Sequence, residues 1–370
     1  MERFSLHPAI LSFPDFQSFA QHHVLTPEDL IFTNEYLYRP FMEAHAPQCP
    51  VCFQERYGAG EPTDRMVEAI LADVDTAKYR RIIAVGGGTV LDVAKLLALK
   101  PFRRVDELFD APELEKSAGL ILIPTTCGTG SEVTNASVVN RTRLGTKQGL
   151  LREALYADEA VLIPQFLQTL PYKVFATSSI DALVHAVESY LNPVNNPFIQ
   201  MFAVSAMEDI LRAYRDIAQN GPDRRFAHSE ALLRASCCAG AAFSNNSCAA
   251  VHALSYALGG KYHVPHGESN YQFFLPVLRA YRRKAPGGRL AELEGILARA
   301  LDCAGENVYD ELEAVLSAVL PNVPMRSYGA VERDVAEFAD STMANQQRLL
   351  GGSYVPLDRQ DVFDIYQSRL

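Results

Sequence analysis

Two short groups of aspartate and histidine side chains are the residues of this sequence best suited to chemistry. Asp181 and His185 lie four positions apart in SSIDALVHAVESY, so a helix would place both on one face. His252 and His266 follow in VHALSYALGGKYHVPHG, where a helix and a turn at Gly259-Gly260 could fold back and bring both rings together. One carboxylate and three imidazoles suit Fe²⁺ or Zn²⁺, with an open position for a substrate oxygen.

Each of these residues also has an ordinary explanation. An Asp–His pair at this spacing is common on helices, and a single histidine is often exposed or satisfied within a core. The hypothesis of a metal centre therefore depends on the coincidence of four suitable ligands in two compact motifs.

A glycine-rich segment upstream could bind the phosphates of a cofactor. Gly86, Gly87, Gly88 and Thr89 follow the strand-like RRIIAV and open the helical pattern VLDVAK. The start of a helix presents unpaired N–H groups and a partial positive charge, and glycines let a ligand approach the backbone. A tight turn without a ligand is the alternative. The segment is not the G-x-G-x-x-G fingerprint, and no suitable acid follows about 20 residues later.

A second polar loop leaves another buried strand. The segment TTCGTGS, residues 125–131, follows GLILIP and gathers hydroxyls and backbone amides that could hold a ribose or phosphate. A polar turn is again the simpler alternative. Two such loops at the ends of neighbouring strands favour a dinucleotide as the ligand.

The pattern of elements predicts an α/β domain with a Rossmann-like parallel sheet over residues 1–164 and an all-helical domain over 165–370. Strand and helix patterns alternate before Pro164, as in RRIIAVGGG followed by TVLDVAKLLALK. Long helical patterns dominate afterwards, such as FIQMFAVSAMEDILRAYRDIAQNG, which Asn220-Gly221 should close. The helical domain would carry the metal ligands.

Composition narrows the classes of partner and the compartment. The 370 residues are 48% hydrophobic with a net charge of −10, and no basic patch suggests nucleic acid or an anionic membrane. The start lacks a signal peptide's apolar core, and no apolar run approaches the roughly 20 residues of a membrane helix. Seven cysteines fit a reducing compartment, although Cys49 and Cys52 could form a redox pair or half a zinc site. We expect a cytoplasmic enzyme with a small-molecule substrate.

Four motifs together resemble the iron-containing alcohol dehydrogenase family, which is grouped with glycerol dehydrogenase and dehydroquinate synthase. They are GGGTVLDVAK, PTTCGTGSEVT, SSIDALVHAVESY and VHALSYALGGKYHVPHG, in the family's order. The resemblance implies the family's two-domain fold, a homodimer or larger homo-oligomer, and Fe²⁺ or Zn²⁺ on Asp181, His185, His252 and His266. It also implies cofactor contacts by Gly86, Gly87, Gly88, Thr89, Asp92, Thr125, Thr126, Thr129, Ser131 and Lys147.

Further peptides resemble the NAD-dependent 4-hydroxybutyrate dehydrogenase branch of the family. They include IFTNEYLYRPF, FQERYGAGEPTD, LPYKVFATSSIDALVHA, HVPHGESNY and NQQRLL. The branch implies interconversion of 4-hydroxybutyrate and succinate semialdehyde with NAD⁺ and NADH. Many relatives carry an acid that contacts the adenosine ribose and disfavours NADP, but the equivalent residue here is Asn34, which adds no charge. Strictness for NAD therefore has less support from the sequence.

The resemblance also exposes two gaps in the expected site. Many relatives have a proton-relay histidine at the position of Tyr256, and an unperturbed tyrosine with a pKa near 10 relays protons poorly. We expect Tyr256 to act as a hydrogen-bond donor or pocket wall, while ribose hydroxyls, water or His263 could carry the proton. A cation should bind the substrate carboxylate, and Arg348, Arg141 and Lys261 are unranked candidates.

Three other functions remain open. The first is a metal-dependent dehydrogenase for another primary alcohol or diol, such as butanol or 1,3-propanediol. The second is a dinucleotide-dependent lyase like the dehydroquinate synthase relatives, which would yield no net NADH. The third is a non-catalytic NAD-binding regulator, which would tolerate loss of the metal ligands.

Overall fold

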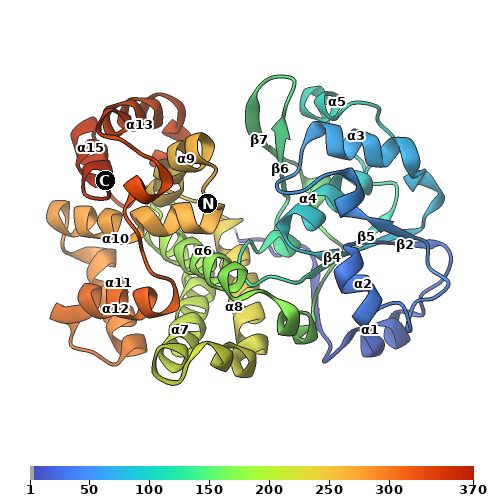
Figure 1. The fold of residues 1–370 in the computed structure, drawn as a ribbon, viewed down its shortest axis with the longest axis horizontal. Coiled ribbons are helices and arrows are strands. Elements are labelled where there is room, and N and C mark those ends of the chain that lie inside the picture. Colours follow the sequence, from blue (N-terminus) through green and yellow to red (C-terminus); the bar gives the residue numbers. More distant parts are fainter. Residues whose placement is uncertain (1–3) are drawn as a thin grey trace. The chain divides into compact units, whose positions relative to one another are not determined.

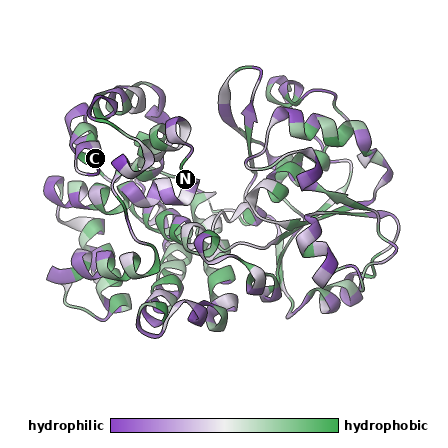
Figure 2. Ribbon diagram, in the orientation of Figure 1, coloured by the Kyte–Doolittle hydropathy of each residue, from purple (hydrophilic) through white to green (hydrophobic). Residues whose placement is uncertain are grey.

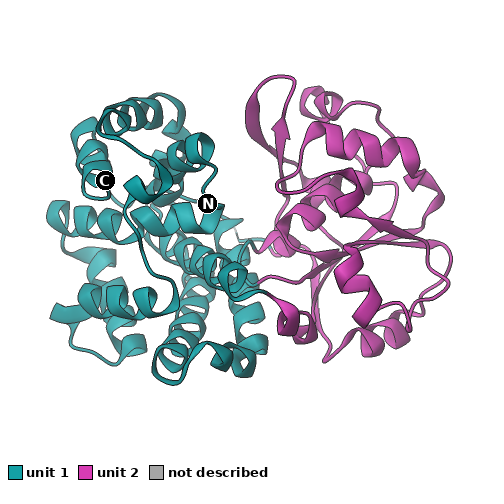
Figure 3. Cartoon of the chain, viewed as in Figure 1, with its two compact units in different colours: residues 1–5, 127–129, 171–370 teal, residues 6–126, 130–170 magenta. Residues whose placement is uncertain are grey.

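The computed structural model describes residues 4–370 (Figure 1). The chain forms two compact units, which Figure 3 colours separately. We call Leu6–Thr126 with Gly130–Leu170 the sheet unit, and Cys127–Thr129 with Pro171–Leu370 the helical unit, which also includes Phe4 and Ser5. Within residues 4–370, no helix is both long enough and apolar enough to cross a membrane.

The sheet unit is built on six parallel strands in the order β1-β8-β5-β4-β2-β3. Thr33 pairs with Val85, and Gly86 pairs with Pro124, so three neighbouring strands end at the same edge of the sheet. The parallel sheet confirms the predicted α/β architecture. The strands are β1 (Ala9–Ser12), β2 (Asp29–Thr33), β3 (Val51–Phe53), β4 (Arg81–Gly86), β5 (Gly119–Pro124) and β8 (Glu159–Leu162).

Helices cover both faces of this sheet. Successive strand residues point to opposite faces, and the residues on each face are apolar, so both faces must be buried. On β4, Ile82 joins one buried cluster and Ile83 joins the other. The Ile82 cluster includes residues of α3 (Asp64–Asp73), α4 (Gly88–Leu97) and α5 (Val105–Asp110), and the Ile83 cluster includes residues of α1 (Phe16–His23) and α2 (Glu35–Phe41).

An antiparallel hairpin in the same unit was not predicted from the sequence. Its strands are β6 (Ala136–Arg141) and β7 (Thr146–Leu151). The hairpin is largely hydrophilic, and most of β7 is exposed (Figure 2). It lacks the alternation of apolar and polar residues by which a half-buried strand is recognised.

The helical unit is organised around α6, which is buried along most of its length and packs against α7, α8 and α10. The caps of α7 follow the predicted pattern. Asn196 accepts hydrogen bonds from the backbone N–H groups of Phe198 and Ile199, and Gly221, with φ of 95°, ends the helix. The helices are α6 (Tyr172–Leu191), α7 (Pro197–Asn220), α8 (Ser229–Phe243), α9 (Ala250–Tyr262), α10 (His266–Lys284), α11 (Gly288–Leu301), α12 (Val308–Val319), α13 (Glu332–Asn345), α14 (Gln347–Leu350) and α15 (Arg359–Gln367).

The chain reversal between His252 and His266 lies later than we expected. Gly259 and Gly260 are inside α9, so the prediction of a turn at these glycines was wrong. The helix instead ends at Tyr262, and His263 takes the left-handed conformation with φ of 55°. Histidine is among the residues found more often in the left-handed region of backbone conformation. His263 can therefore end the helix, and the chain does not need the two glycines for its turn.

Candidate metal centre

Helix α6 carries three polar side chains into the interior of the helical unit. Asp181 and His185 lie one turn apart, and Glu188 follows three residues after His185, so all three share one face. All three are nearly inaccessible to solvent. Buried polar groups need partners, and helices α9 and α10 provide them.

A glycine lets α10 approach α6 closely enough to complete the cluster. His266 is the first residue of α10, and Gly267 follows it. A Cβ atom on Gly267 would lie 2.0 Å from the carbonyl oxygen of Thr177 and 3.3 Å from Cβ of Asp181. No side chain fits at such a distance. The missing side chain therefore permits the contact that places His266 beside Asp181.

Ligand atoms of Asp181, His252 and His266 all lie within 4.8 Å of one another, and His185 adjoins this group through His252. Nε2 of His185 and Nε2 of His252 are 3.0 Å apart. Oδ1 of Asp181 lies 3.7 Å from Nε2 of His252 and 3.8 Å from Nε2 of His266. Ligand atoms that share one ion at about 2.1 Å from it lie about 3 to 4 Å from one another. These separations suit a common ion.

The chemistry of the cluster also fits a cation. Nδ2 of Asn270 lies 2.6 Å from Oδ1 of Asp181, 3.1 Å from Nε2 of His252 and 3.3 Å from Nε2 of His266. An amide nitrogen has two hydrogens, so it cannot satisfy three acceptors. The buried acceptor atoms of Asp181, His252 and His266 thus outnumber the hydrogens that Asn270 can donate. A divalent cation would bind the lone pairs that are left without a donor.

The protonation states favour the same conclusion. Burial lowers the pKa of His252 well below its ordinary value and also lowers the pKa of His185. Burial acts to raise the pKa of Asp181, but the three histidines and Asn270 outweigh this effect, and its pKa is lowered. An anionic carboxylate beside neutral imidazoles is the form that binds metal ions.

Glu188 orients one of these rings. Its carboxylate lies 2.6 Å from Nδ1 of His252 and accepts hydrogen bonds from the backbone N–H groups of Ala249, at 2.8 Å, and Val251, at 2.6 Å. Burial raises the pKa of Glu188 to about 7 despite these bonds. The contact keeps the single proton of the neutral ring at Nδ1, so the lone pair of Nε2 faces the other ligands.

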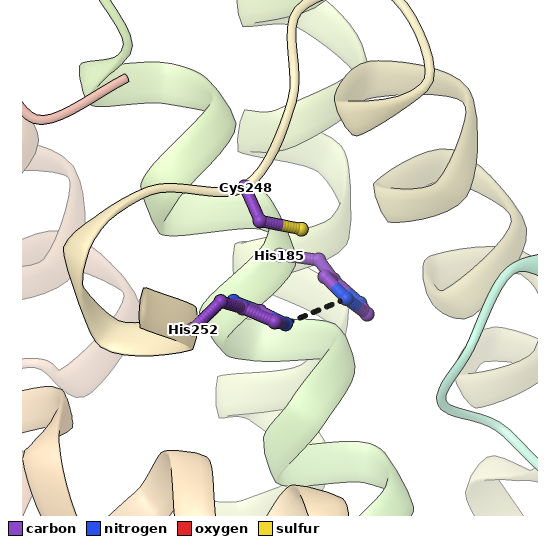
Figure 4. Close-up of side chains that lie close together, drawn as sticks. All are labelled: His185, Cys248 and His252. Carbon is purple, nitrogen blue, oxygen red and sulfur yellow. Dashed lines mark hydrogen bonds between the residues drawn. The ribbon is translucent and has the colours of Figure 1, made fainter. Parts of the chain in front are cut away.

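Cys248 offers a second set of possible ligands. Its sulfur and nitrogen atoms of His185 and His252 all lie within 4.8 Å of one another (Figure 4). Burial raises the pKa of Cys248 well above its ordinary value, so the sulfur is a neutral thiol. Because a thiolate is the form that binds metals, the group of Asp181, His252 and His266 fits an ion better.

The cluster opens to solvent on the side of His266. The side chain of His266 is 35% exposed, whereas that of His252 is 4% exposed. The ring of Tyr256 lies 6.4 Å from the ring of His266, between centroids. His263 is exposed at the end of α9. A substrate could therefore reach the predicted ligands past His266 and Tyr256.

The predicted cofactor loops gather at one edge of the sheet. Gly86 ends β4, Gly87 caps α4, and the backbone N–H of Thr125 donates to the carbonyl of Gly86 at 3.0 Å. A Cβ atom on Gly86 would lie 2.5 Å from Cβ of Val90, so only glycine allows this tight entry into α4. The second predicted cofactor loop is divided between the two units: Thr125 and Thr126 belong to the sheet unit, whereas Thr129 belongs to the helical unit.

Other residues expected to contact the cofactor form hydrogen bonds or ion pairs with side chains and backbone groups of the sheet unit. Asp92 Oδ1 accepts hydrogen bonds from Ser131, at 2.6 Å, and from the buried Lys95, at 3.3 Å, and its Oδ2 accepts one from the backbone of Val138. Thr89 donates to the Gly60 carbonyl, and Lys147 pairs with Glu61. Their direct contact with a cofactor stays a prediction.

Asn34 lies at the same edge and has an acidic neighbour. It follows β2 and donates through Nδ2 to a carboxylate oxygen of Glu55 at 2.8 Å. Glu55 also accepts from the backbone N–H of Glu35 at 2.6 Å. The negative charge that Asn34 does not carry is therefore supplied beside it by Glu55, a residue 21 positions away in the sequence.

Sequence reasoning missed Glu188, Asn270 and Glu55. Two of them had a local signal: Glu188 is three residues after His185, and Asn270 is four residues after His266, so each shares a helical face with a predicted ligand. Glu55 had none, because its position beside Asn34 depends on the packing of separate strands.

Comparisons with known proteins match most of the chain to two family models. Residues 23–164 match the sequence model named "Iron-containing alcohol dehydrogenase", and residues 175–370 match "Fe-containing alcohol dehydrogenase family, C-terminal". The two matches cover all strands of the parallel sheet except β1, and they include all four predicted ligands.

Individual relatives cover most of the chain. The 4-hydroxybutyrate dehydrogenase of Clostridium kluyveri is 45% identical over 368 residues, which are 99% of this chain and 99% of that protein. Long-chain-alcohol dehydrogenase 1 of Geobacillus thermodenitrificans is 37% identical over 83% of this chain and 79% of that protein.

Solved structures share the fold. Sulfoacetaldehyde reductase from Bifidobacterium kashiwanohense, solved in complex with NAD⁺, has a TM-score of 0.85 at 19% identity and covers 100% of this chain and 98% of its own. An iron-containing alcohol dehydrogenase from Thermococcus thioreducens has a TM-score of 0.83 at 24% identity, with 99% of each chain covered. At these identities the likeness is one of architecture.

Proposed function

Because the chain belongs to the iron-containing alcohol dehydrogenase family, we propose that it interconverts 4-hydroxybutyrate and succinate semialdehyde with NAD⁺ and NADH, in a metal-dependent reaction. The observation that carries this proposal is the 45% identity with the Clostridium kluyveri 4-hydroxybutyrate dehydrogenase over 99% of both chains. The matched region spans both units of the chain.

Asp181, His185, His252 and His266 would hold the metal ion. A bound divalent ion supplies Lewis-acid polarisation of the substrate oxygen, and bound NAD⁺ supplies the hydride acceptor. The chain prepares these residues before any ligand arrives. Glu188 keeps the His252 proton on Nδ1, and Asn270 donates to Asp181 and orients its carboxylate.

The carboxyl edge of the sheet would hold the cofactor. Gly86 to Thr89 and the start of α4 present backbone N–H groups suited to a pyrophosphate, and Thr125 and Thr126 lie beside them. Glu55, which accepts a hydrogen bond from Asn34, places negative charge where the adenosine ribose is predicted to bind. That charge favours NAD⁺ over NADP⁺, which carries an additional phosphate there.

A second candidate function is oxidation of another primary alcohol or a diol. It is supported by the 37% identity with the long-chain-alcohol dehydrogenase over 83% of this chain. The predicted ligands and cofactor loops suit both functions, and only the surroundings of the substrate tail distinguish them.

The test is NADH formation from 4-hydroxybutyrate, 1-butanol and 1,3-propanediol, using protein freed of metal by a chelator and resupplied with Fe²⁺ or Zn²⁺. We expect metal-dependent turnover that strongly favours 4-hydroxybutyrate. Preference for a plain alcohol would support the second function instead. Absence of turnover with all three substrates, despite binding of metal and NAD⁺, would contradict both dehydrogenase functions and favour a lyase or a regulator.

We also propose that the protein acts in the cytoplasm as a homodimer or larger homo-oligomer. The cysteine content supports the location, and the family resemblance supports the assembly. Light scattering on the purified chain would measure the assembly directly.

A further inference from the structure

The carboxylate of the proposed substrate needs a cationic partner, and two of three candidate side chains are already neutralised. Arg141 donates through Nε, at 2.9 Å, and Nη2, at 2.7 Å, to Asp106. Lys261 pairs with Asp334 at 2.5 Å and with Glu337 at 3.0 Å. Freeing either cation would break an existing ion pair, so neither is well suited to receive a substrate anion.

Arg348 differs from both of them. It lies in α14 and is exposed, and no hydrogen bond or ion pair joins its guanidinium to any residue between 4 and 370. An exposed guanidinium without an internal partner keeps all five N–H donors for a ligand. Its charge is also not offset by a neighbouring carboxylate.

The fold brings the segment that carries Arg348 close to the elements that carry the predicted metal ligands. Helix α14 packs against α9, which carries His252. Just after α14, Gly352 lies so close to the loop before α9 that a Cβ atom there would be 2.9 Å from the carbonyl oxygen of Cys248. The sulfur of Cys248 is within 4.8 Å of ring nitrogens of His185 and His252.

We propose that Arg348 binds the carboxylate of the substrate while the alcohol end lies at the cluster of Asp181, His185, His252 and His266. This inference rests on the proposed function and adds its selectivity determinant. In extended 4-hydroxybutyrate the hydroxyl oxygen and the carboxylate carbon are about 5 Å apart, given covalent bonds of about 1.5 Å. An arginine side chain is long and flexible, and its guanidinium can make a bidentate contact with a carboxylate. The ligand class is a short acid with a terminal hydroxyl or aldehyde.

The test compares Arg348→Ala, Arg348→Lys and the control Arg283→Ala. Arg283 is also exposed and has no partner among the described residues, but it lies in the last turn of α10. The quantities are kcat and KM for 4-hydroxybutyrate and for 1-butanol, which lacks a carboxylate, and inhibition of 1-butanol oxidation by butyrate. All are measured on metal-loaded, full-length protein.

For Arg348→Ala we expect kcat/KM for 4-hydroxybutyrate, relative to that for 1-butanol, to fall about 10- to 100-fold, chiefly through KM. Butyrate should inhibit this variant more weakly by a similar factor. Arg348→Lys should retain part of the preference, since it keeps the charge and loses the bidentate geometry. Arg283→Ala should match the wild type.

Two results would overturn the inference alone: an unchanged ratio in Arg348→Ala, or an equal loss with both substrates. The first would make Arg348 a solvated surface charge, and the second would make it a structural residue. Failure of the wild type to oxidise 4-hydroxybutyrate would instead overturn the proposed function, and the inference with it.

Discussion

At the scale of single residues, the contact between Glu188 and His252 determines which ring nitrogen is available to an ion. The carboxylate lies 2.6 Å from Nδ1 and is itself fixed by two backbone N–H groups. Because it fixes both the proton and the ring orientation, Glu188 should contribute to metal affinity without touching the metal.

Glu188→Gln should therefore weaken Zn²⁺ binding about 10- to 100-fold. The amide keeps the size of the side chain but loses its charge and offers a donor where an acceptor is needed. Competition with a chromophoric chelator measures the affinity. Glu132→Gln is the matched control, since it removes another buried carboxylate that lies in the sheet unit. Equal affinities in Glu188→Gln and the wild type would contradict the role.

Glu55 provides a residue-scale prediction about the cofactor. Its carboxylate is the nearest source of negative charge to Asn34 that we identify. Glu55→Gln should raise kcat/KM for NADP⁺ relative to NAD⁺ about 5- to 30-fold, because a repulsion of about 1 to 2 kcal/mol is removed. Glu43→Gln, which changes an exposed acid paired with Arg39, should leave the ratio unchanged. If both variants behave alike, the ribose does not bind beside Glu55.

The sequence predicted residue identities better than residue partners. The four predicted ligands follow from side-chain type and from the i, i+4 spacing of Asp181 and His185, and the structure groups Asp181, His252 and His266 with His185 beside His252. The contact between Glu55 and Asn34 depends on how β2 and β3 pair, which no local pattern records. Partners distant in sequence are set by packing, so they become visible only in three dimensions.

At the scale of elements, the approach of α10 to α6 depends on Gly267. Gly267→Ala would force a backbone shift, because its Cβ atom would lie 2.0 Å from the Thr177 carbonyl oxygen. We expect this variant to lose about 1 to 3 kcal/mol of unfolding free energy and to bind Zn²⁺ more weakly, since His266 moves away from Asp181.

Gly260→Ala is the control for this prediction. Gly260 lies inside α9, and its Cβ atom would meet nothing within 4 Å. Alanine there should stabilise the helix by about 0.5 to 1 kcal/mol. Urea unfolding and chelator competition on both variants provide the measurements. A Gly267→Ala protein with wild-type stability and affinity would show that α10 does not need this contact.

Helix patterns predicted the elements well but not where they break. The apolar spacing of 197–220 and the cap at Gly221 predicted α7 correctly. The run AVERDVAEFADSTMANQQRLL has one continuous helical pattern, whereas the structure ends α13 at Asn345 and begins α14 at Gln347. Without proline or glycine at the break, the sequence has no local signal for it.

At the scale of the whole molecule, a buried acid should make stability depend on pH. Burial raises the pKa of Glu132 to about 7, against the opposing effects of its own backbone amide and Lys95. The folded chain therefore holds this proton to a higher pH than the unfolded chain, whose glutamate has a pKa near 4.5. The contribution of Glu132 to unfolding free energy should fall by about 3 kcal/mol as pH rises from about 4.5 to about 7, and then level off.

Glu132→Gln should remove this contribution, because the amide does not titrate. Urea unfolding of both proteins at about pH 5 and about pH 8 isolates the effect as the difference between their pH dependences. The wild type should lose more stability than the variant on going to the higher pH. Parallel behaviour would mean that solvent reaches the carboxylate in the native state.

The central claim is that one ion, held by Asp181, His185, His252 and His266, makes the protein a 4-hydroxybutyrate dehydrogenase. The most direct test titrates chelated protein with Fe²⁺ or Zn²⁺ while following bound metal and the initial rate of NADH formation from 4-hydroxybutyrate. We predict that both rise together and saturate at one ion per chain, and that His185→Ala shows neither. A rate that is independent of added metal, or one that persists in His185→Ala, would contradict the account.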